Sequence, residues 1–209
     1  MSADDARARF AAATEAHLTA PLDDGIAIRH VDAAAWHAAA DPIWAAASER
    51  TNVNPTRLIP PEQLARGADL DAVLGPPLAH RLLLVAGDEV IGAYWGVQEP
   101  SSRYYMVNTA MRPEWQGRGL YRRLLPRIVA AATDAGFAEI WSRHRADNNQ
   151  VLVPKLRAGF TIAAFEVSPR WGLLVHLRRY LREVNARMHT YRVDGSGAAS
   201  LRADGLPLP

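Results

Sequence analysis

The sequence predicts an α/β (α+β) fold in which a mixed, mostly antiparallel central sheet carries helices on both faces. Between residues 81 and 111, three apolar-rich segments follow one another across short turns, as strands of an antiparallel meander do. A long helix follows, because apolar residues recur there at every fourth position: Leu120, Leu124, Ile128 and Ala132. Strands that form a meander before this helix exclude a doubly wound dinucleotide-binding fold.

The first half of the chain predicts mainly helices. Asp32 can cap an Ala-rich helical stretch that runs up to Arg50, and Pro42 inside it implies a break or two successive helices. The polar loop Thr51–Pro55 between the early helices is a candidate substrate lid. The other elements expected here are an amphipathic helix at Ala3–His17, a strand at Ile26–His30 and a short helix opened by Pro60 and Pro61.

The second half predicts the sheet and the helices that cover it. In order we expect strands at Arg81–Ala86, Val90–Gln98 and Tyr104–Met111, a helix at Gly117–Ala135 bent by Pro126, a strand at Ala138–Arg143, a helix at Asn148–Ala158, strands at Phe160–Val167 and Leu173–Leu177, and a polar helix to about Arg192. The chain therefore divides into an N-terminal helical extension (1–25), a single domain (26–192) and a tail (193–209). The tail is rich in Gly, Ala, Ser and Pro and is expected to be disordered.

The composition excludes several classes of protein. With no cysteine among 209 residues, disulfides, thiolate metal sites and a cysteine nucleophile are ruled out. A net charge of +2 gives no reason to expect nucleic acid, and no apolar run approaches the roughly 20 residues that span a bilayer. The start of the chain lacks the apolar stretch of a secretory signal, so a cytoplasmic protein is expected. His144, Asp147 and Glu166 lack a metal-ligand spacing, so no metal is predicted.

The segment Met111–Tyr121 carries the strongest chemical signal. A strand ends at Pro113, and a glycine-bearing turn leads directly into a helix. Backbone N–H groups at a helix start are not used by helical hydrogen bonds, and with the helix dipole they bind phosphate or pyrophosphate. The sequence does not contain the P-loop pattern, and the pattern G-x-G-x-x-G fails because residue 122 is Arg. The alternative is that Gly117 and Gly119 only allow a tight turn.

The same segment resembles the acyl-CoA signature [Q/R]-x-x-G-x-[G/A] of the GNAT superfamily of N-acyltransferases. Its counterpart here is Gln116–Tyr121, and about 40 residues later Asn148 opens a helix that ends in Gly159-Phe160, which is similar to the second element of that family. The resemblance covers residues 26–178 and implies a GNAT-like fold that binds acetyl-CoA or another acyl-CoA. The cofactor-binding residues that it implies are Met111, Arg112, Gln116, Gly117, Arg118, Gly119, Leu120, Tyr121, Asn148 and Lys155.

Two residues depart from the family pattern. Tyr121 stands where the signature has Gly or Ala, one turn into the helix, so the amides before it remain available. Lys155 stands four residues before Gly159, where the family often has a tyrosine that protonates the departing thiolate. The other 23 basic residues are all Arg, which favours a special role for this one lysine. Lys155 is therefore a candidate proton donor or phosphate ligand, and an exposed helix lysine is the alternative.

The resemblance implies that an amine attacks the thioester of acyl-CoA directly, and we expect transfer of an acetyl group to a small-molecule primary amine. The backbone N–H of Met111 is the expected donor to the oxyanion, and Asn148 would hold the pantetheine arm or merely cap its helix. Glu99 at a strand end is the preferred general base. Other candidates for this role are His144, His176 and Asn108 through a water, and the aromatic residues expected near the acceptor are Tyr94, Trp95, Tyr105 and Trp115.

Two other functions remain open from the sequence. Without the usual tyrosine, the chain can be a regulatory module that binds acyl-CoA without catalysis. It can also use another donor, such as a longer acyl-CoA or aminoacyl-tRNA, although the small net charge argues against tRNA. The last strand and the polar helix after it can support a homodimer, which nothing in the sequence specifies.

Overall fold

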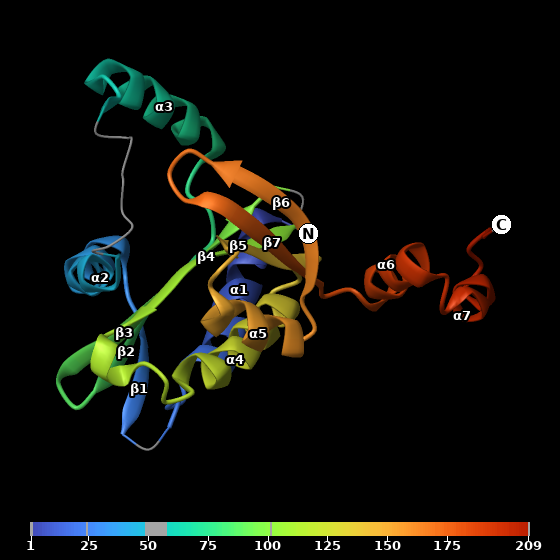
Figure 1. The fold of residues 1–209 in the computed structure, drawn as a ribbon, viewed down its shortest axis with the longest axis horizontal. Helices are drawn as coiled ribbons and strands as arrows, with labels where there is room; N and C mark the ends of the chain where they lie inside the picture. Colours follow the sequence, from blue (N-terminus) through green and yellow to red (C-terminus); the bar gives the residue numbers. More distant parts are fainter. Residues whose placement is uncertain (1, 24, 49–57, 101, 209) are drawn as a thin grey trace.

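A seven-stranded sheet with helices on both faces forms the body of the protein (Figure 1). The computed structural model describes residues 2–23, 25–48, 58–100 and 102–208. Along the sheet the strands are ordered β1-β2-β3-β4-β5-β7-β6, and β4–β5 is the parallel pair among antiparallel ones. This arrangement confirms the predicted mixed, mostly antiparallel sheet.

The described elements follow the predicted order. They are α1 (Ala3–Leu18), β1 (Ile26–His30), α2 (Ala33–Ser48), α3 (Pro61–Leu74), β2 (Ala79–Ala86), β3 (Glu89–Glu99), β4 (Arg103–Met111), the short 3₁₀ helix η2 (Pro113–Trp115), α4 (Leu120–Asp134), β5 (Glu139–Arg145), α5 (Asn149–Arg157), β6 (Thr161–Ser168), β7 (Gly172–Tyr180), α6 (Glu183–Asp194) and α7 (Ala198–Ala203).

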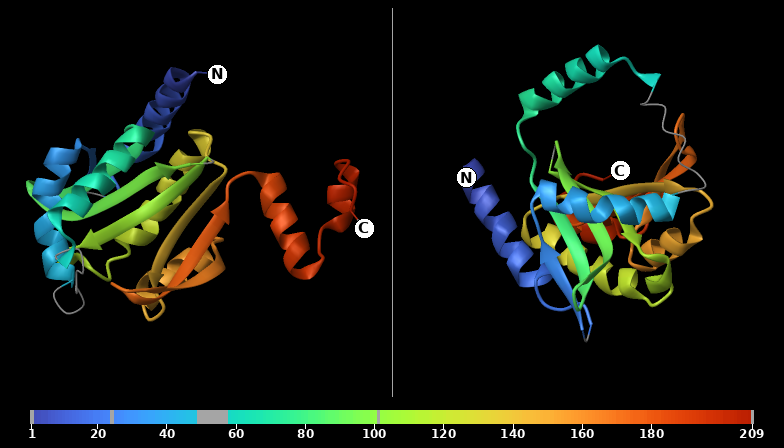
Figure 2. Two further views of the ribbon diagram at one scale, coloured as in Figure 1. Left: turned by 90° about the horizontal axis from the view of Figure 1, so that it is seen from above. Right: turned by 90° about the vertical axis from the view of Figure 1, so that its left-hand side faces the viewer.

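The two faces of the sheet bury separate apolar clusters. On one face α1, α4 and α5 cover a large cluster that includes Leu124, Ile128 and Leu152. On the other face α2 covers a smaller cluster around Trp36, whose indole N–H donates to the carbonyl of Tyr94 across 3.0 Å. The two further views in Figure 2 show α1 and α2 on opposite sides of the strands. Burial of both faces is what holds a sheet of this kind together.

The N-terminal helix is fastened to the sheet by a chain of buried polar groups. The Thr14 hydroxyl lies 2.9 Å from Nε2 of His80, and Nδ1 of His80 lies 2.7 Å from the Tyr104 hydroxyl. Tyr94 donates in turn to Tyr104 across 3.0 Å. Phe10 of the same helix lies in the large apolar cluster. The segment expected as an extension thus shares the core of the domain, and the division at residue 25 stays a prediction.

Two local expectations differ from the structure. A single helix, α2, continues through Pro42, although a break was expected there. Burial of Trp36, Ala40 and Ile43 against the sheet offsets the hydrogen bond that the proline cannot donate. The candidate lid at residues 51–55 lies outside the described residues.

The expected disordered tail is helical in part. It forms α7, whose Leu201 is buried, and Arg187 of α6 pairs with Asp204 and donates to Ser200. These contacts let two short helices stabilise each other, although composition alone favours disorder. Figures 1 and 2 show α6 and α7 extending away from the sheet.

Candidate active site

The parallel strands β4 and β5 separate after the first three residues of each. They pair at Arg103–Tyr105 against Glu139–Trp141, and the described residues beyond those positions form no further pair between the two strands. A β-bulge causes the separation on the β4 side, because the register against β3 shifts between Trp95 and Gly96 and leaves Val107 without a partner. A bulge bends its strand and increases its twist. The sheet therefore opens between the ends of β4 and β5.

A cavity occupies this opening. The residues that line it come from β4, the start of α4, β5 and the start of α5: Met106, Val107, Asn108, Thr109, Tyr121, Arg143, His144, Asn148, Val151 and Lys155. Three of the residues singled out for cofactor binding, Tyr121, Asn148 and Lys155, thus share one cavity. It also contains two of the side chains considered as bases, Asn108 and His144.

The turn before α4 presents backbone amides beside this cavity. Gly117 and Gly119 have φ angles of 73° and 75°, a conformation that glycine adopts without strain. The first helical bond of α4 runs from the N–H of Arg123 to the carbonyl of Gly119. No acceptor for the N–H groups of residues 117–122 is found in the described part of the chain. Free amides at the positive end of a helix dipole are an arrangement that suits a phosphate or pyrophosphate.

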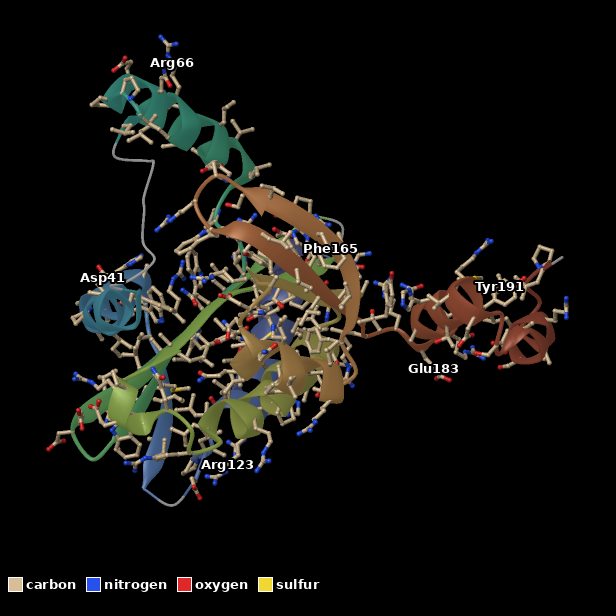
Figure 3. All side chains as sticks on the ribbon, in the orientation of Figure 1. Asp41, Arg66, Arg123, Phe165, Glu183 and Tyr191 are labelled. Atoms are coloured by element: carbon tan, nitrogen blue, oxygen red, sulfur yellow. The ribbon has the colours of Figure 1, made fainter. Side chains whose placement is uncertain are left out.

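Side chains around the turn hold its shape. Gln116 donates from its amide nitrogen to the carbonyl of Met111 across 3.0 Å, which ties the turn to the end of β4. The guanidinium of Arg118 stacks over the ring of Trp115 at 4.5 Å. Arg123, labelled in Figure 3, is paired with Asp23. The side chain of Leu120 is buried in the core, so only its backbone faces the site.

Met111 and Arg112 point in opposite directions at the end of β4. The N–H of Arg112 donates to the carbonyl of Ile91 on β3. Because backbone groups alternate along a strand, the N–H of Met111 is directed away from β3, toward the opening. The Arg112 guanidinium donates to the carbonyl of Val90 and lies 3.5 Å from Glu89. The Arg112 side chain is thus engaged at the turn of the β2–β3 hairpin, and its implied cofactor contact stays a prediction.

Lys155 lies at the apex of the opening, which is the point where β4 and β5 begin to separate. Its side chain is completely buried. Its Nζ lies 2.5 Å from Oγ of Ser142 and 3.2 Å from the sulfur of Met106, the first residues of β5 and β4 beyond the paired stretch. The amine also sits 5.0 Å from the centre of the Phe160 ring. Burial lowers the pKa of Lys155 well below its usual value near 10.5, because an apolar environment disfavours the charged ammonium. The alternative of an exposed helix lysine is thus excluded.

His144 continues the same polar group toward the outside. Its Nε2 lies 2.9 Å from Oγ of Ser142, on the side of β5 that also faces Lys155. Burial, with a smaller contribution from Lys155, lowers the pKa of His144 from 6.5 to about 3. His144 is therefore neutral near pH 7, with one ring nitrogen protonated and the other free to accept.

Within the described part of the chain, the side chain of Asn148 has no hydrogen-bond partner and is available to a ligand. Asn148 directly precedes α5, yet its side chain makes no capping hydrogen bond. The backbone carbonyl of Asn148 accepts the N–H of Leu152. Since it also lines the cavity, the role of a simple helix cap does not account for it. An amide that can both donate and accept suits the amides of a pantetheine arm.

Glu99 does not lie on the cavity. Its carboxylate accepts from the indole N–H of Trp141 across 2.7 Å and lies 3.4 Å from Arg103, at the end where β4 and β5 are still paired. Met106 and Ser142 face Lys155, and side chains alternate along a strand. The neighbouring side chains Tyr105 and Trp141 therefore project from the opposite face of the sheet. Glu99 therefore belongs to that opposite face, away from the lysine.

The predicted aromatic group is divided between several places. Tyr94 is buried within the large core cluster, whereas Trp95 packs against Trp36 on the other face. Tyr105, another member of the predicted group, stacks on Trp141 with their ring centres 4.4 Å apart. His176 follows Trp141 across the same face and lies 2.7 Å from Glu166. Tyr105, Trp141 and His176 thus form a half-buried wall behind the opening.

Ser142 is a residue of the candidate site that the sequence did not predict. It joins Lys155 to His144, yet a lone serine within a strand carries no motif. The spacing between Ser142 and His144 could have indicated this link. The two residues lie two positions apart on one strand and so share a face. Which helix residue meets that face depends on the packing of α5, which periodicity does not give.

Comparison with known proteins agrees with this geometry. The family described as "Acetyltransferase (GNAT) family" matches residues 43–160, and the chain belongs to that family. The resemblance seen in the sequence is therefore confirmed. No curated protein sequence matches the chain.

Several solved structures share the fold at low identity. The structure of yncA from Salmonella typhimurium with its cofactor acetyl-CoA is 20% identical, with a TM-score of 0.54 over 76% of this chain and 95% of its own. RimL, a ribosomal L7/L12 α-N-protein acetyltransferase in complex with coenzyme A, is 16% identical (TM-score 0.56; 77% and 96%). The ribosomal-protein-S18-alanine N-acetyltransferase from Escherichia coli is 17% identical (0.53; 75% and 94%).

Among the described residues, no helix is both long and apolar enough to cross a bilayer. In the same residues, no three acidic, histidine or cysteine side chains come together as a metal site would require.

Proposed function

We propose that the chain is an N-acyltransferase that moves an acetyl group from acetyl-CoA to the primary amine of a small molecule. The observation that carries this proposal is the opening between β4 and β5, with free amides at one side and a buried lysine at its apex. The amides suit the diphosphate of an acyl-CoA, and the lysine suits a proton transfer during amide formation.

The residues around the opening suit coenzyme A. The amides of residues 117–122 match a pyrophosphate in charge and in hydrogen-bonding capacity. The unused side chain of Asn148 and the outward backbone groups of β4 match the amides of the pantetheine arm. When bound there, acetyl-CoA supplies the acetyl group as a reactive thioester. The side chain of Tyr121, at the cavity wall, would contact the arm without covering the amides before it.

Two groups of the protein would handle charge and protons during transfer. The outward N–H of Met111 would donate to the oxygen that becomes negative when the amine attacks. Lys155 would transfer a proton to the departing sulfur, a role in which a lysine of lowered pKa is effective near neutral pH. Its burial and its direct contact with Ser142 support this role over that of a phosphate ligand at the surface.

A small amine as acceptor is supported by the wall of aromatic residues on the opposite face. Tyr105 and Trp141 are stacked and half-buried, and the carboxylate of Glu99 touches the indole of Trp141. Aromatic faces next to a carboxylate suit a cationic amine before it loses its proton. Glu99 would attract such an amine, and a water or the substrate itself would carry the proton away from its nitrogen.

Two measurements test the proposed function. Titration calorimetry with acetyl-CoA should show binding at one site per chain, and a thiol-release assay over a panel of small primary amines should identify an acceptor. Peptides with free N-termini serve as the contrasting acceptors. Release of thiol with peptides alone would overturn the small-molecule acceptor, and an absence of acetyl-CoA binding would overturn the whole proposal.

A second function is favoured by one observation, the lysine at the position where the family often has tyrosine. Without that tyrosine, the chain can be a module that binds acyl-CoA without catalysis. Binding of acetyl-CoA without thiol release from any amine or peptide would identify this alternative. Binding of longer acyl-CoAs in preference to acetyl-CoA would instead change the donor.

A further inference from the structure

Three polar side chains form a continuous line from the apex of the opening to the mouth of the cavity. Nζ of Lys155 lies 2.5 Å from Oγ of Ser142, which lies 2.9 Å from Nε2 of His144. Lys155 and Ser142 are fully buried, whereas His144 is partly exposed. Burying Lys155 and Ser142, with His144 partly buried beside them, has a desolvation cost that apolar side chains would avoid. Such a cost suggests that the line has a use.

We propose that Lys155, Ser142 and His144 form a proton relay, in which His144 and Ser142 resupply the buried lysine with protons from solvent. The relay rests on the proposed acyl transfer and adds two positioning residues to it. Because the Lys155 side chain is fully buried, a proton that it gives to the departing sulfur can be replaced through neighbouring groups. Ser142 is the nearest protein group that can both accept and donate a proton.

The proton balance of the relay is complete. As the bond between the acyl carbon and nitrogen forms and the bond between carbon and sulfur breaks, Lys155 gives one proton to sulfur. The Ser142 hydroxyl then gives its proton to Nζ and takes one from Nε2 of His144, which is refilled from water at Nδ1. The surplus proton on the attacking amine is released to water, and proton exchange at the ring nitrogens returns His144 to its starting tautomer. Amide and thiol are then formed with no net change in the protein.

The surroundings of Lys155 favour transfer along this line. From β4 the amine meets the sulfur of Met106, and the ring of Phe160 lies 5.0 Å away. The other titratable or charged groups that line the cavity are His144, Arg143 and Tyr121. Arg143 is engaged with Tyr105 and Glu166, and burial raises the pKa of Tyr121, which keeps its phenol neutral. In the described cavity wall, the route from Lys155 through Ser142 to His144 is thus the one whose members lie within hydrogen-bond distance of each other.

The single lysine of the chain allows a test that needs no activity. Lysine labelled with ¹³C at Cε gives one signal, whose deuterium isotope shift reports how fast the Nζ hydrogens exchange with D₂O. With the relay, Ser142→Ala and His144→Gln should each slow this exchange at least tenfold. Ser168→Ala, which changes another buried serine outside the cavity, is the matched control and should leave the rate unchanged. Equal rates in all four proteins would overturn the relay.

A second test uses transfer with the amine found to be the best acceptor. Ser142→Ala should lower kcat more than tenfold and leave KM for acetyl-CoA within twofold, and Ser142→Thr, which keeps the hydroxyl, should restore part of the loss. The proton inventory of kcat in H₂O–D₂O mixtures should be curved in the wild type and linear in Ser142→Ala. An unchanged kcat in Ser142→Ala would overturn the relay, even where the wild type is active.

The two proposals fail in different ways. If no amine supports thiol release in the wild type, the proposed function fails, and the exchange rates still decide whether the relay exists. If transfer occurs but exchange and kcat do not respond to Ser142 or His144, the relay fails and acyl transfer stands.

Discussion

The Nδ1 atom of His80 lies 2.7 Å from the hydroxyl oxygen of Tyr104, within a core that water does not reach. Burial lowers the pKa of His80 from 6.5 to about 3 and raises the pKa of Tyr104. Both groups therefore stay neutral across the physiological range, and the hydrogen bond between them joins β2 to β4 without a buried charge.

This neutrality predicts an acid-sensitive fold. In an unfolded chain His80 and His144 bind protons with a pKa near 6.5, whereas in the folded protein both values are about 3. The stability from neutral histidines is complete above pH 6.5 and falls as the pH drops from 6.5 toward 3. The expected slope of the unfolding free energy is up to about 1.4 kcal/mol per pH unit for each histidine.

Urea unfolding between pH 6.5 and 5 measures this slope, because the carboxylates titrate below that window. His80→Phe should reduce the slope by about half, whatever it does to stability at pH 7. His37→Gln, a change at an exposed histidine of α2, is the control and should leave the slope as it is. A flat profile in the wild type would contradict the neutral state of both buried histidines.

Gly96 should not tolerate even a methyl group. A β-carbon at this position would overlap the hydroxyl groups of Tyr94 and Tyr104 and lie 2.6 Å from the ring carbon Cζ of Tyr104. Gly96→Ala should therefore lower the unfolding free energy by about 3 kcal/mol, as overpacked cores do. Gly67→Ala, in the exposed middle of α3 with open space around it, should raise stability by about 0.5–1 kcal/mol. Equal effects would contradict this packing.

Gly119→Val tests the pyrophosphate site. A β-branched residue disfavours the φ angle of 75° at Gly119, so the turn and its amides should shift. The affinity for coenzyme A, measured by calorimetry, should fall more than about tenfold, equivalent to roughly 1.4 kcal/mol. Gly195 has the same φ in the C-terminal helices, so Gly195→Val introduces the same strain and should leave the affinity unchanged. An unaltered affinity in Gly119→Val would remove the pyrophosphate assignment.

Lys155→Met separates the possible roles of the buried lysine. Methionine fills a similar volume without a polar group, so the variant should fold with stability equal to or above that of the wild type. If Lys155 protonates the leaving sulfur, turnover should fall by about 10²–10⁴ with little change in affinity for coenzyme A. A fall in affinity alone would make it a phosphate ligand, and no change in either would make it structural.

The sequence was most informative where function depends on local backbone geometry. The turn at Gly117 and Gly119 was found by its spacing, because positive φ angles require particular residues at particular positions. Lys155 was found by counting back from Gly159, another glycine with positive φ. The fold class followed from periodicity, since a sheet with two buried faces imposes its pattern on every strand.

What the sequence missed depends on contacts between distant segments. The direction of the Arg112 side chain is decided by Val90 and Glu89, about twenty residues earlier in the chain. The link from Lys155 to Ser142 depends on how α5 packs on β5. The helix through Pro42 survives because of burial against the sheet. Local propensity carries none of this information.

The burial of Lys155 also bears on how such a protein would coexist with its own reactive donor. Acetyl-CoA slowly modifies accessible lysines wherever it accumulates, and 23 of the 24 basic residues here are arginines, which do not react in this way. The one lysine is enclosed by Met106, Ser142 and Phe160. The surface therefore offers no lysine side chain for accidental self-acetylation, and its positive charge persists however much donor surrounds it.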